Sequence, residues 1–230
     1  MFYITGDKHG EFTFLERFCK TANTTTEDVL IILGDAGINY YEDIRDMVRK
    51  EHLKSFPITL FCIHGNHEAR PSTIISYKKK KMFGGEVYID EEYPNQLFAI
   101  DGEVYNFNGK EAIVIGGAYS VDKEYRIARG WKWFADEQPS EEIKNKVRQT
   151  LKEREGKVDF IFSHTCPLHY EPVEWFLSGV DQSTVDKSTE IFLNYIEANT
   201  SYERWFCGHY HGEKEIDKMC FLFNSILTLC

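Results

Sequence analysis

Short runs of hydrophobic residues alternate along the chain with stretches of helical periodicity. Residues 29–33, Val-Leu-Ile-Ile-Leu, are continuously apolar, which is typical of a strand buried on both faces. Similar runs predict further strands at residues 2–4, 58–63, 158–162, 205–207 and 216–223. Apolar residues three and four positions apart predict helices at residues 12–20, 42–53, 140–154 and 185–198, the third with Ser140 as its N-cap. The alternation of strands with helices favours an α/β fold.

The middle of the chain has a different pattern. Three short apolar segments follow one another, separated by Asp101-Gly102 and by Asn108-Gly109, at residues 97–100, 103–107 and 111–115. Asp-Gly and Asn-Gly pairs supply the positive φ angles of tight hairpin turns, so we expect a meander here. One sheet would then be built by strand–helix crossovers and a second by hairpins. No linker, composition shift or repeat divides the chain, so we expect a single domain over residues 1–230.

Composition narrows the class of protein. The 230 residues include 27 basic and 37 acidic side chains, a net charge of −10, which disfavours general nucleic-acid binding but leaves open a local basic groove. No segment approaches the ~20 apolar residues of a membrane span, and the first residues do not resemble a signal peptide. The six scattered cysteines form no C-x-x-C pair, so we expect free thiols and a cytoplasmic protein.

Polar residues of a few types follow five of the predicted strands. They are Asp7 and His9, then Asp35, then Asn66 and His67, then His164, and finally His209 and His211. A single Asp in such a place is a turn former or helix cap about as often as a ligand, and a single His is more often a hydrogen-bonded polar residue than a ligand, but the joint pattern is informative. Strand carboxyl ends line the ligand crevice of open α/β sheets, so seven oxygen and nitrogen ligands, with His67 beside them, would converge there. That number is too large for one ion and fits two divalent metals roughly 3.5–4 Å apart that share one carboxylate.

Taken together and in this order, these motifs resemble those of the calcineurin-like metallophosphoesterase superfamily, in particular its small bacterial and phage members. The motifs are Gly6-Asp7-Lys8-His9, Gly34-Asp35, Gly65-Asn66-His67-Glu68, His164 and Gly208-His209-Tyr210-His211. The resemblance implies a four-layer α-β-β-α sandwich of two mixed sheets with a centre of two metal ions. It also implies ligand roles: Asp7, His9 and His211 for one metal, Asn66, His164 and His209 for the other, and Asp35 as the bridge.

The resemblance further implies an activity. A hydroxide held between the two metals would hydrolyse a phosphodiester or phosphomonoester, and His67 would assist the leaving group. We expect manganese, with iron, zinc, nickel and cobalt as alternatives, and a small or nucleotide-like substrate. A Ser/Thr-type protein phosphatase, a nuclease and a catalytically idle scaffold of the same fold are the alternative functions. The complete ligand set, with His67 beside it, argues against the scaffold.

Departures from the protein phosphatases of this superfamily weaken that alternative. Those enzymes carry Gly-Asp-x-x-Asp-Arg-Gly, whereas this chain has Ile38 in place of the Asp that orients the catalytic His, and Asn39 in place of a phosphate-binding Arg. Arg70 matches an Arg of some of these phosphatases. It is either a phosphate contact or a solvent-exposed charge.

Residues 116–139 follow a predicted strand and should reach the active-site face. Trp131, Trp133 and Phe134 place three aromatic rings in one loop, which forms either a small core beneath the loop or a platform for a flat leaving group. Tyr119, Lys123 and Trp131 are therefore candidate substrate contacts. The run Lys78–Lys81 is expected to be a solvated face, with steering of an anionic substrate as the alternative.

Overall fold

The computed structural model describes residues 1–229, and its strands form two mixed sheets. The first sheet has the order β13 (Leu227–Leu229), β1 (Phe2–Thr5), β2 (Val29–Ile32), β3 (Thr59–Cys62), β6 (Gln96–Ala99), β5 (Gly85–Ile89) and β4 (Lys78–Met82). The second has the order β11 (Lys214–Ile216), β12 (Met219–Phe221), β10 (Arg204–Cys207), β9 (Phe160–Ser163), β8 (Lys110–Ile115) and β7 (Val104–Phe107).

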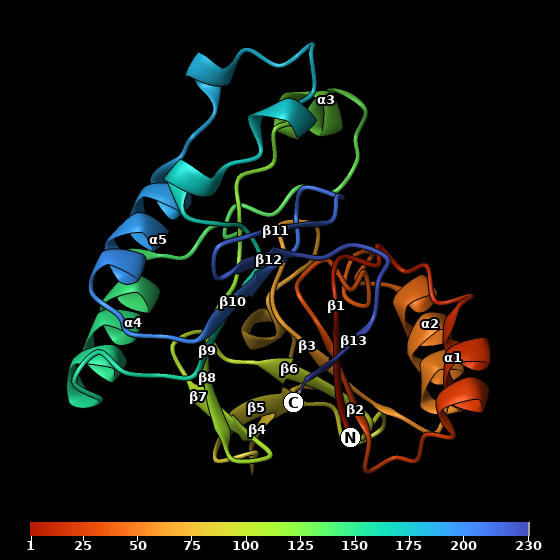
Figure 1. Ribbon diagram of the computed structural model, residues 1–230. Helices are drawn as coiled ribbons and strands as arrows, with labels where there is room; N and C mark the ends of the chain where they lie inside the picture. Colours follow the sequence, from red (N-terminus) through yellow and green to blue (C-terminus); the bar gives the residue numbers. More distant parts are fainter. Residues whose placement is uncertain (230) are drawn as a thin grey trace.

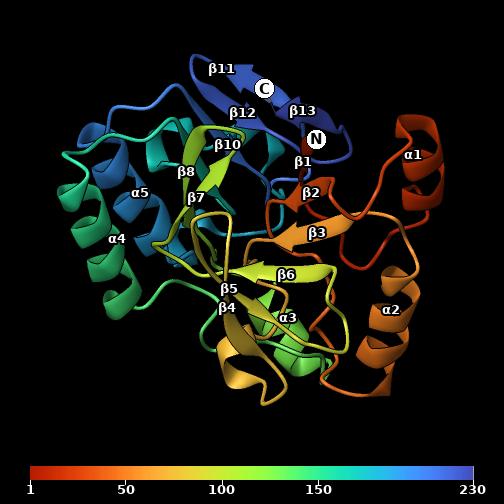
Figure 2. The same cartoon turned by 90° about the horizontal axis from the view of Figure 1, so that it is seen from below.

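Helices cover the outer faces of both sheets. Side chains of α1 (Leu15–Ala22) and α2 (Ile44–Lys54) pack on the first sheet, and those of α4 (Glu141–Glu153) and α5 (Ser188–Ala198) pack on the second. Figure 2 shows these layers in order, with α4 and α5 on the left, the strands in the middle, and α1 and α2 on the right. The expected α-β-β-α sandwich is confirmed. The fifth helix, α3 (Lys123–Ala128), lies at the top of Figure 1.

Three hydrophobic cores hold the four layers together. In β2, Ile31 belongs to the core between the two sheets, and its neighbours Leu30 and Ile32 belong to the core beneath α1 and α2. In β10, Phe206 faces the other sheet, and Trp205 belongs to the core beneath α4 and α5. Because successive side chains of a strand point to opposite faces, a strand covered on both sides must be apolar throughout. This explains the continuous hydrophobic runs.

Helix signals in the sequence agree with the structure to within a few residues. The hydroxyl of Ser140 accepts a hydrogen bond of 3.3 Å from the backbone N–H of Ile143, so the predicted N-cap of α4 is confirmed. Asp43 caps α2 in the same way through the N–H of Arg45. The helices predicted to start at residues 12 and 185 begin later, at Leu15 and Ser188.

The expected meander over residues 97–115 is wrong in part. The Asn108-Gly109 hairpin is confirmed, because β7 and β8 pair antiparallel and both turn residues have positive φ, 57° and 88°. Asp101-Gly102, in contrast, carries the chain from one sheet to the other. β6 pairs parallel with β3 in the first sheet, where Leu97 and Phe98 are buried in two different cores. Burial on both faces decided this pairing, which the turn signal alone could not show.

Each sheet is therefore a mixture of crossovers and hairpins, contrary to expectation. The first sheet contains the antiparallel pair β4–β5, and the second contains the parallel neighbours β8, β9, β10 and β12. The lysine run 78–81 is an exposed edge strand, where charged side chains discourage pairing with other chains. The strand predicted at 216–223 is two strands, because β11 turns back antiparallel onto β12.

The topology brings several strand ends together near the middle of Figure 1, at the upper ends of the strands. The loops that follow β1, β2, β3, β9 and β10 meet there. Two further segments lie above them: residues 116–139, which include α3, and residues 167–187, which contain three short 3₁₀ turns. Within residues 1–229, no helix combines the length and hydrophobicity needed to cross a lipid bilayer.

Candidate metal centre

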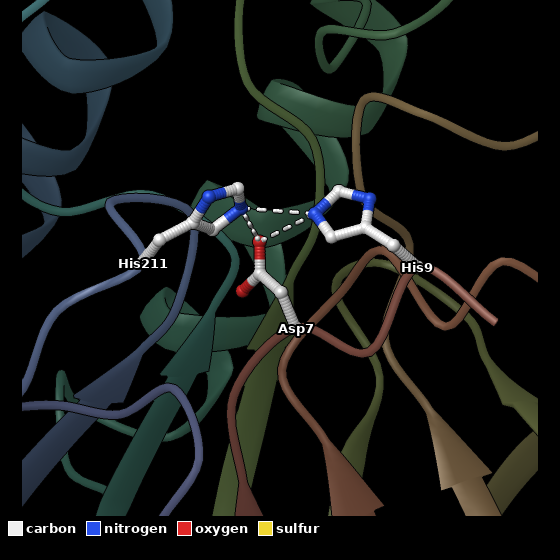
Figure 3. A group of neighbouring side chains, drawn as sticks. All are labelled: Asp7, His9 and His211. Atoms are coloured by element: carbon white, nitrogen blue, oxygen red, sulfur yellow. Dashed lines mark hydrogen bonds and ion pairs between the residues drawn. The ribbon is translucent and has the colours of Figure 1, made fainter. Parts of the chain in front are cut away.

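The first group of candidate ligands comprises Asp7, His9 and His211, shown in Figure 3. The Nε2 atoms of His9 and His211 are 2.9 Å apart, and they lie 3.7 and 3.3 Å from Oδ2 of Asp7. This oxygen is buried and accepts no hydrogen bond from the described residues, whereas Oδ1 accepts the N–H of His209 at 2.7 Å. Three atoms with lone pairs thus point at one place, which is the arrangement that a divalent cation requires.

The second group is built around His164 and Asp35. The Nδ1 atom of His164 lies 2.8 Å from the carbonyl oxygen of Leu33, a contact that needs the proton on Nδ1 and leaves the Nε2 lone pair free. Nε2 lies 3.6 Å from Oδ2 of Asp35 and 2.8 Å from Oδ1 of Asn66. The amide nitrogen of Asn66 donates to Ser120 at 2.9 Å, which turns its oxygen toward His164. These residues also fit a cation.

Two carboxylates lie between the groups. Oδ2 of Asp35 is 3.8 Å from Nε2 of His9 and 3.6 Å from Nε2 of His164. Asp7 is near both groups as well, because the ligand atoms of Asp7, Asp35 and His164 all lie within 4.8 Å of one another. The ring of His209 packs beside that of His164, with centroids 5.0 Å apart. The seven residues predicted as ligands therefore come together at one place.

The backbone at this place is strained. His9, Asp35, His209 and His211 have φ angles of 46°, 48°, 67° and 50°, in the left-handed region that L-residues seldom adopt. Such conformations cost about 1–3 kcal/mol each and persist where the surrounding structure enforces them, often at functional sites. Gly65 permits the closest approach, because a Cβ atom there would lie 1.9 Å from Oδ1 of Asp35.

The surroundings of the candidate ligands favour ionised Asp7 and Asp35 and a neutral His209, whereas the contact with Asp7 raises the pKa of His211. Burial alone would raise the pKa of Asp7, but the surrounding imidazoles, chiefly His164, outweigh burial and lower it. The pKa of Asp35 is lowered against burial in the same way, again chiefly by His164. Burial, with a further contribution from His164, lowers the pKa of His209 to about 3. A neutral imidazole offers a lone pair, so the ionised carboxylates of Asp7 and Asp35 and the neutral ring of His209 are in the protonation states that metal ligands need.

His67 lies beside the two groups and contacts Arg126, a residue that sequence reasoning missed. The N–H of His67 donates to Oδ1 of Asp35 at 2.8 Å, and its Nδ1 contacts the Arg126 guanidinium. Since a guanidinium can only donate, Nδ1 must accept, and the proton of the neutral ring is on Nε2. Arg126 is held by Asp122 at 2.8 Å. The only sequence signal for it was the Asp-x-x-x-Arg spacing on one helical face.

A cavity of about 420 Å³ opens from this centre. At one end the lining consists of His67 and candidate ligands, namely His9, Asp35, Asn66, His209 and His211. The remainder is lined by residues between 119 and 126 and between 171 and 190. Tyr119, a predicted substrate contact, is among the lining residues. Arg70, Lys123 and Trp131 are not.

The other predicted substrate contacts have local partners. Arg70 forms an ion pair of 2.7 Å with Asp101, and its side chain is only 12% exposed, so it is not a free surface charge. The Lys123 ammonium lies 4.2 Å from the centre of the Trp133 ring. Trp131 is 54% exposed and packs against Tyr125.

Cysteines do not contribute to either group of candidate ligands. The five cysteines within residues 1–229 are free and buried, and Cys230 lies outside the described residues. Cys207, which follows Phe206 in β10, belongs to the core beneath α4 and α5, as the alternation of side chains along the strand predicts. Cys166 belongs to the same core, and its Sγ lies 3.5 Å from the hydroxyl of Tyr210.

Comparison with known proteins agrees with this architecture. Residues 1–213 match the family model described as calcineurin-like phosphoesterase, so the chain belongs to the calcineurin-like phosphoesterase family. The crystal structure of TT1561 of Thermus thermophilus aligns with 96% of this chain and 87% of its own, at 13% identity and a TM-score of 0.51, which supports the fold alone. A second solved structure aligns at 14% identity over 96% of this chain and 88% of its own, with a TM-score of 0.49. No curated protein sequence matches the chain.

Proposed function

We propose that this chain hydrolyses phosphoester bonds with two divalent metal ions, manganese being the first candidate. The observation that carries the proposal is the convergence of acceptor atoms from Asp7, His9 and His211 and from Asp35, Asn66 and His164 at the end of a cavity. Asp7, His9 and His211 would hold one ion, Asn66, His164 and His209 the other, and Asp35 would bridge them. When bound, the ions supply Lewis acidity, which activates water and neutralises the charge of phosphate oxygens.

His67 is the residue that would assist the leaving group. Its backbone is tied to Asp35, and its Nδ1 faces Arg126, so the Nε2–H is the donor left for the leaving-group oxygen. In the protein phosphatases an Asp orients the corresponding His, and Ile38 stands in its place here. Arg126, held by Asp122, would orient the ring instead, and burial, with a further contribution from Arg126, lowers the pKa of His67. His67 therefore acts as a hydrogen-bond donor to the leaving-group oxygen.

Hydrolysis of p-nitrophenyl phosphate and of bis-p-nitrophenyl phosphate, assayed with added Mn²⁺, tests the proposal. We expect turnover of at least one ester, its loss on chelation, and its recovery when Mn²⁺ is restored. Asp35→Asn should abolish most of the activity. Asp217→Asn, in the turn between β11 and β12, is the matched control with the same change of side chain. A well-folded chain that binds metal but hydrolyses neither ester would instead be an idle scaffold.

A further inference from the structure

The cavity lining beyond the candidate ligands is largely apolar, with Glu171, Gln182, Lys187 and Glu190 among its polar members, and metal binding does not explain it. Val121 contributes to it from the segment that includes α3, and Trp175, Phe176, Leu177, Val180 and Val185 contribute from the segment 171–187. The cavity volume of about 420 Å³ lies within the range of about 300–1,000 Å³ that is usual for small-molecule sites. Metals and a phosphate group need only the polar end. The apolar part is therefore available to the group that the phosphate esterifies.

One buried polar group lines this apolar part without a full set of partners. Glu190, in the first turn of α5, is 4% exposed, and its Oε1 accepts the hydroxyl of Thr165 at 2.8 Å. Its Oε2 is buried and has no hydrogen-bond partner among the described residues. Leaving such an atom unpaired costs about 1–3 kcal/mol. A ligand that carries an N–H donor would remove this cost.

The charged neighbours of Glu190 are already engaged. Lys187 binds both carboxylate oxygens of Glu171, at 2.7 and 2.9 Å, and its ammonium lies 4.6 Å from the centre of the Phe176 ring. This ion pair connects two residues of the cavity lining, Glu171 and Lys187. Among the buried acidic side chains of this lining, Glu190 has an oxygen that no described residue engages.

We propose that this part of the cavity binds the leaving group of the substrate and that the leaving group carries a nucleobase with an exocyclic amine. This rests on the proposed phosphoesterase function and narrows its substrate class to nucleotides. A flat ring matches the aromatic and branched apolar side chains, and the amine matches the free acceptor of Glu190. A sugar would leave the apolar wall unmatched, and an alkyl chain would leave Glu190 unpaired. Among phosphoesters, nucleotides combine both features.

Glu190→Gln gives a sharp test, because it exchanges an acceptor for a donor with little change of shape. The amide oxygen would keep the hydrogen bond from Thr165, so the amide NH₂ would replace Oε2. An amine on the base would then meet another donor. Glu197→Gln, two turns further along α5 and outside the cavity lining, is the matched control.

Nucleosides carry no phosphoester, so they can be titrated against the full chain as purified without turnover. We would measure Kd by calorimetry for adenosine, guanosine and cytidine, each against its analogue that lacks the exocyclic amine: purine riboside, inosine and pyrimidin-2-one riboside. Burial raises the pKa of Glu190 to about 7, so titration at pH 8 keeps its carboxylate ionised. We expect at least one of the three nucleosides to bind with a Kd below about 1 mM.

The amine should strengthen binding about tenfold in the wild type, the range of one hydrogen bond to a charged group. Glu190→Gln should remove this preference while leaving the analogue's Kd within about threefold of the wild-type value, and Glu197→Gln should retain it. Failure of all three nucleosides to bind overturns the inference, as does an unchanged preference in Glu190→Gln. Ester hydrolysis without nucleoside binding would refute this inference alone, whereas binding without hydrolysis would refute the proposed activity.

Discussion

Replacing His67 with asparagine should separate leaving-group assistance from metal binding. The backbone N–H that donates to Asp35 is kept, and Asn66 remains in place, so both metals should stay bound. The change removes the Nε2–H that the Arg126 contact leaves free. A hydrogen-bond donor to a developing oxyanion is worth about 10²–10³-fold in rate, or about 3–4 kcal/mol of transition-state stabilisation. We therefore expect His67→Asn to lose about 10²–10³-fold in activity on an alkyl phosphoester, whose leaving oxygen develops the most charge.

The p-nitrophenyl esters provide the comparison, because p-nitrophenolate departs without protonation. On these substrates we expect His67→Asn to lose about tenfold or less. The assay is kcat/KM for both ester types with Mn²⁺ present, accompanied by elemental analysis of bound metal. Equal losses on both esters, or loss of a metal ion, would refute the role of His67 as the donor to the leaving group.

Arg126→Met is a second variant that keeps the imidazole and removes its partner. Without the guanidinium, Nδ1 is free to carry the proton, and the ring is held less firmly. We expect an intermediate loss on alkyl esters, about tenfold, with little change on p-nitrophenyl esters. A variant as active as the wild type on alkyl esters would show that Arg126 does not position His67.

Asp35→Asn should lower the occupancy of both metals, because the Asp35 carboxylate lies between His9 and His164; elemental analysis that finds one ion fully retained would contradict the bridging role. Cys166→Ser and Cys207→Ser should keep full activity and metal content, since both thiols belong to a core and not to the ligand groups; metal loss in either variant would overturn this. Burial raises the pKa of Glu190 from 4.5 to about 7, so the folded chain holds this proton more tightly than the unfolded chain. Stability should therefore fall as pH rises between these values, by at most about 3 kcal/mol, and Glu190→Gln should reduce the drop in Tm from pH 5 to pH 8; an equal drop in both proteins would show that Glu190 is not its source.

Much of the architecture follows from short-range patterns. The apolar run at residues 29–33 requires burial on both faces, and Asn108-Gly109 and Ser140 define a hairpin and a helix start through local backbone chemistry. The candidate ligands could also be predicted, because the ends of parallel strands meet at one edge of a sheet. Their residue types and order along the chain were then enough to indicate the family.

Other features depend on contacts between residues far apart in the chain. Whether the segment at 97–100 continues into a hairpin or joins β3 depends on which faces are buried, and Asp101-Gly102 is compatible with both. The lysines at 78–81 carry no hydrophobic alternation, so their strand exists only because β5 pairs with it.

The cavity lining beyond the candidate ligands is the clearest example of a feature that the sequence does not predict. Residues 171–187 have neither helical nor strand periodicity, and short 3₁₀ turns shape them into a wall. The contact of Arg126 with His67 and the unpaired oxygen of Glu190 likewise arise only when separate segments pack together. The sequence by itself determined most of the strands and helices and the set of candidate metal ligands, because each of these has a local or periodic signature. Tertiary structure alone decided the sheet to which β6 belongs, the partner of His67 and the shape of the cavity, because these depend on which distant surfaces exclude water together.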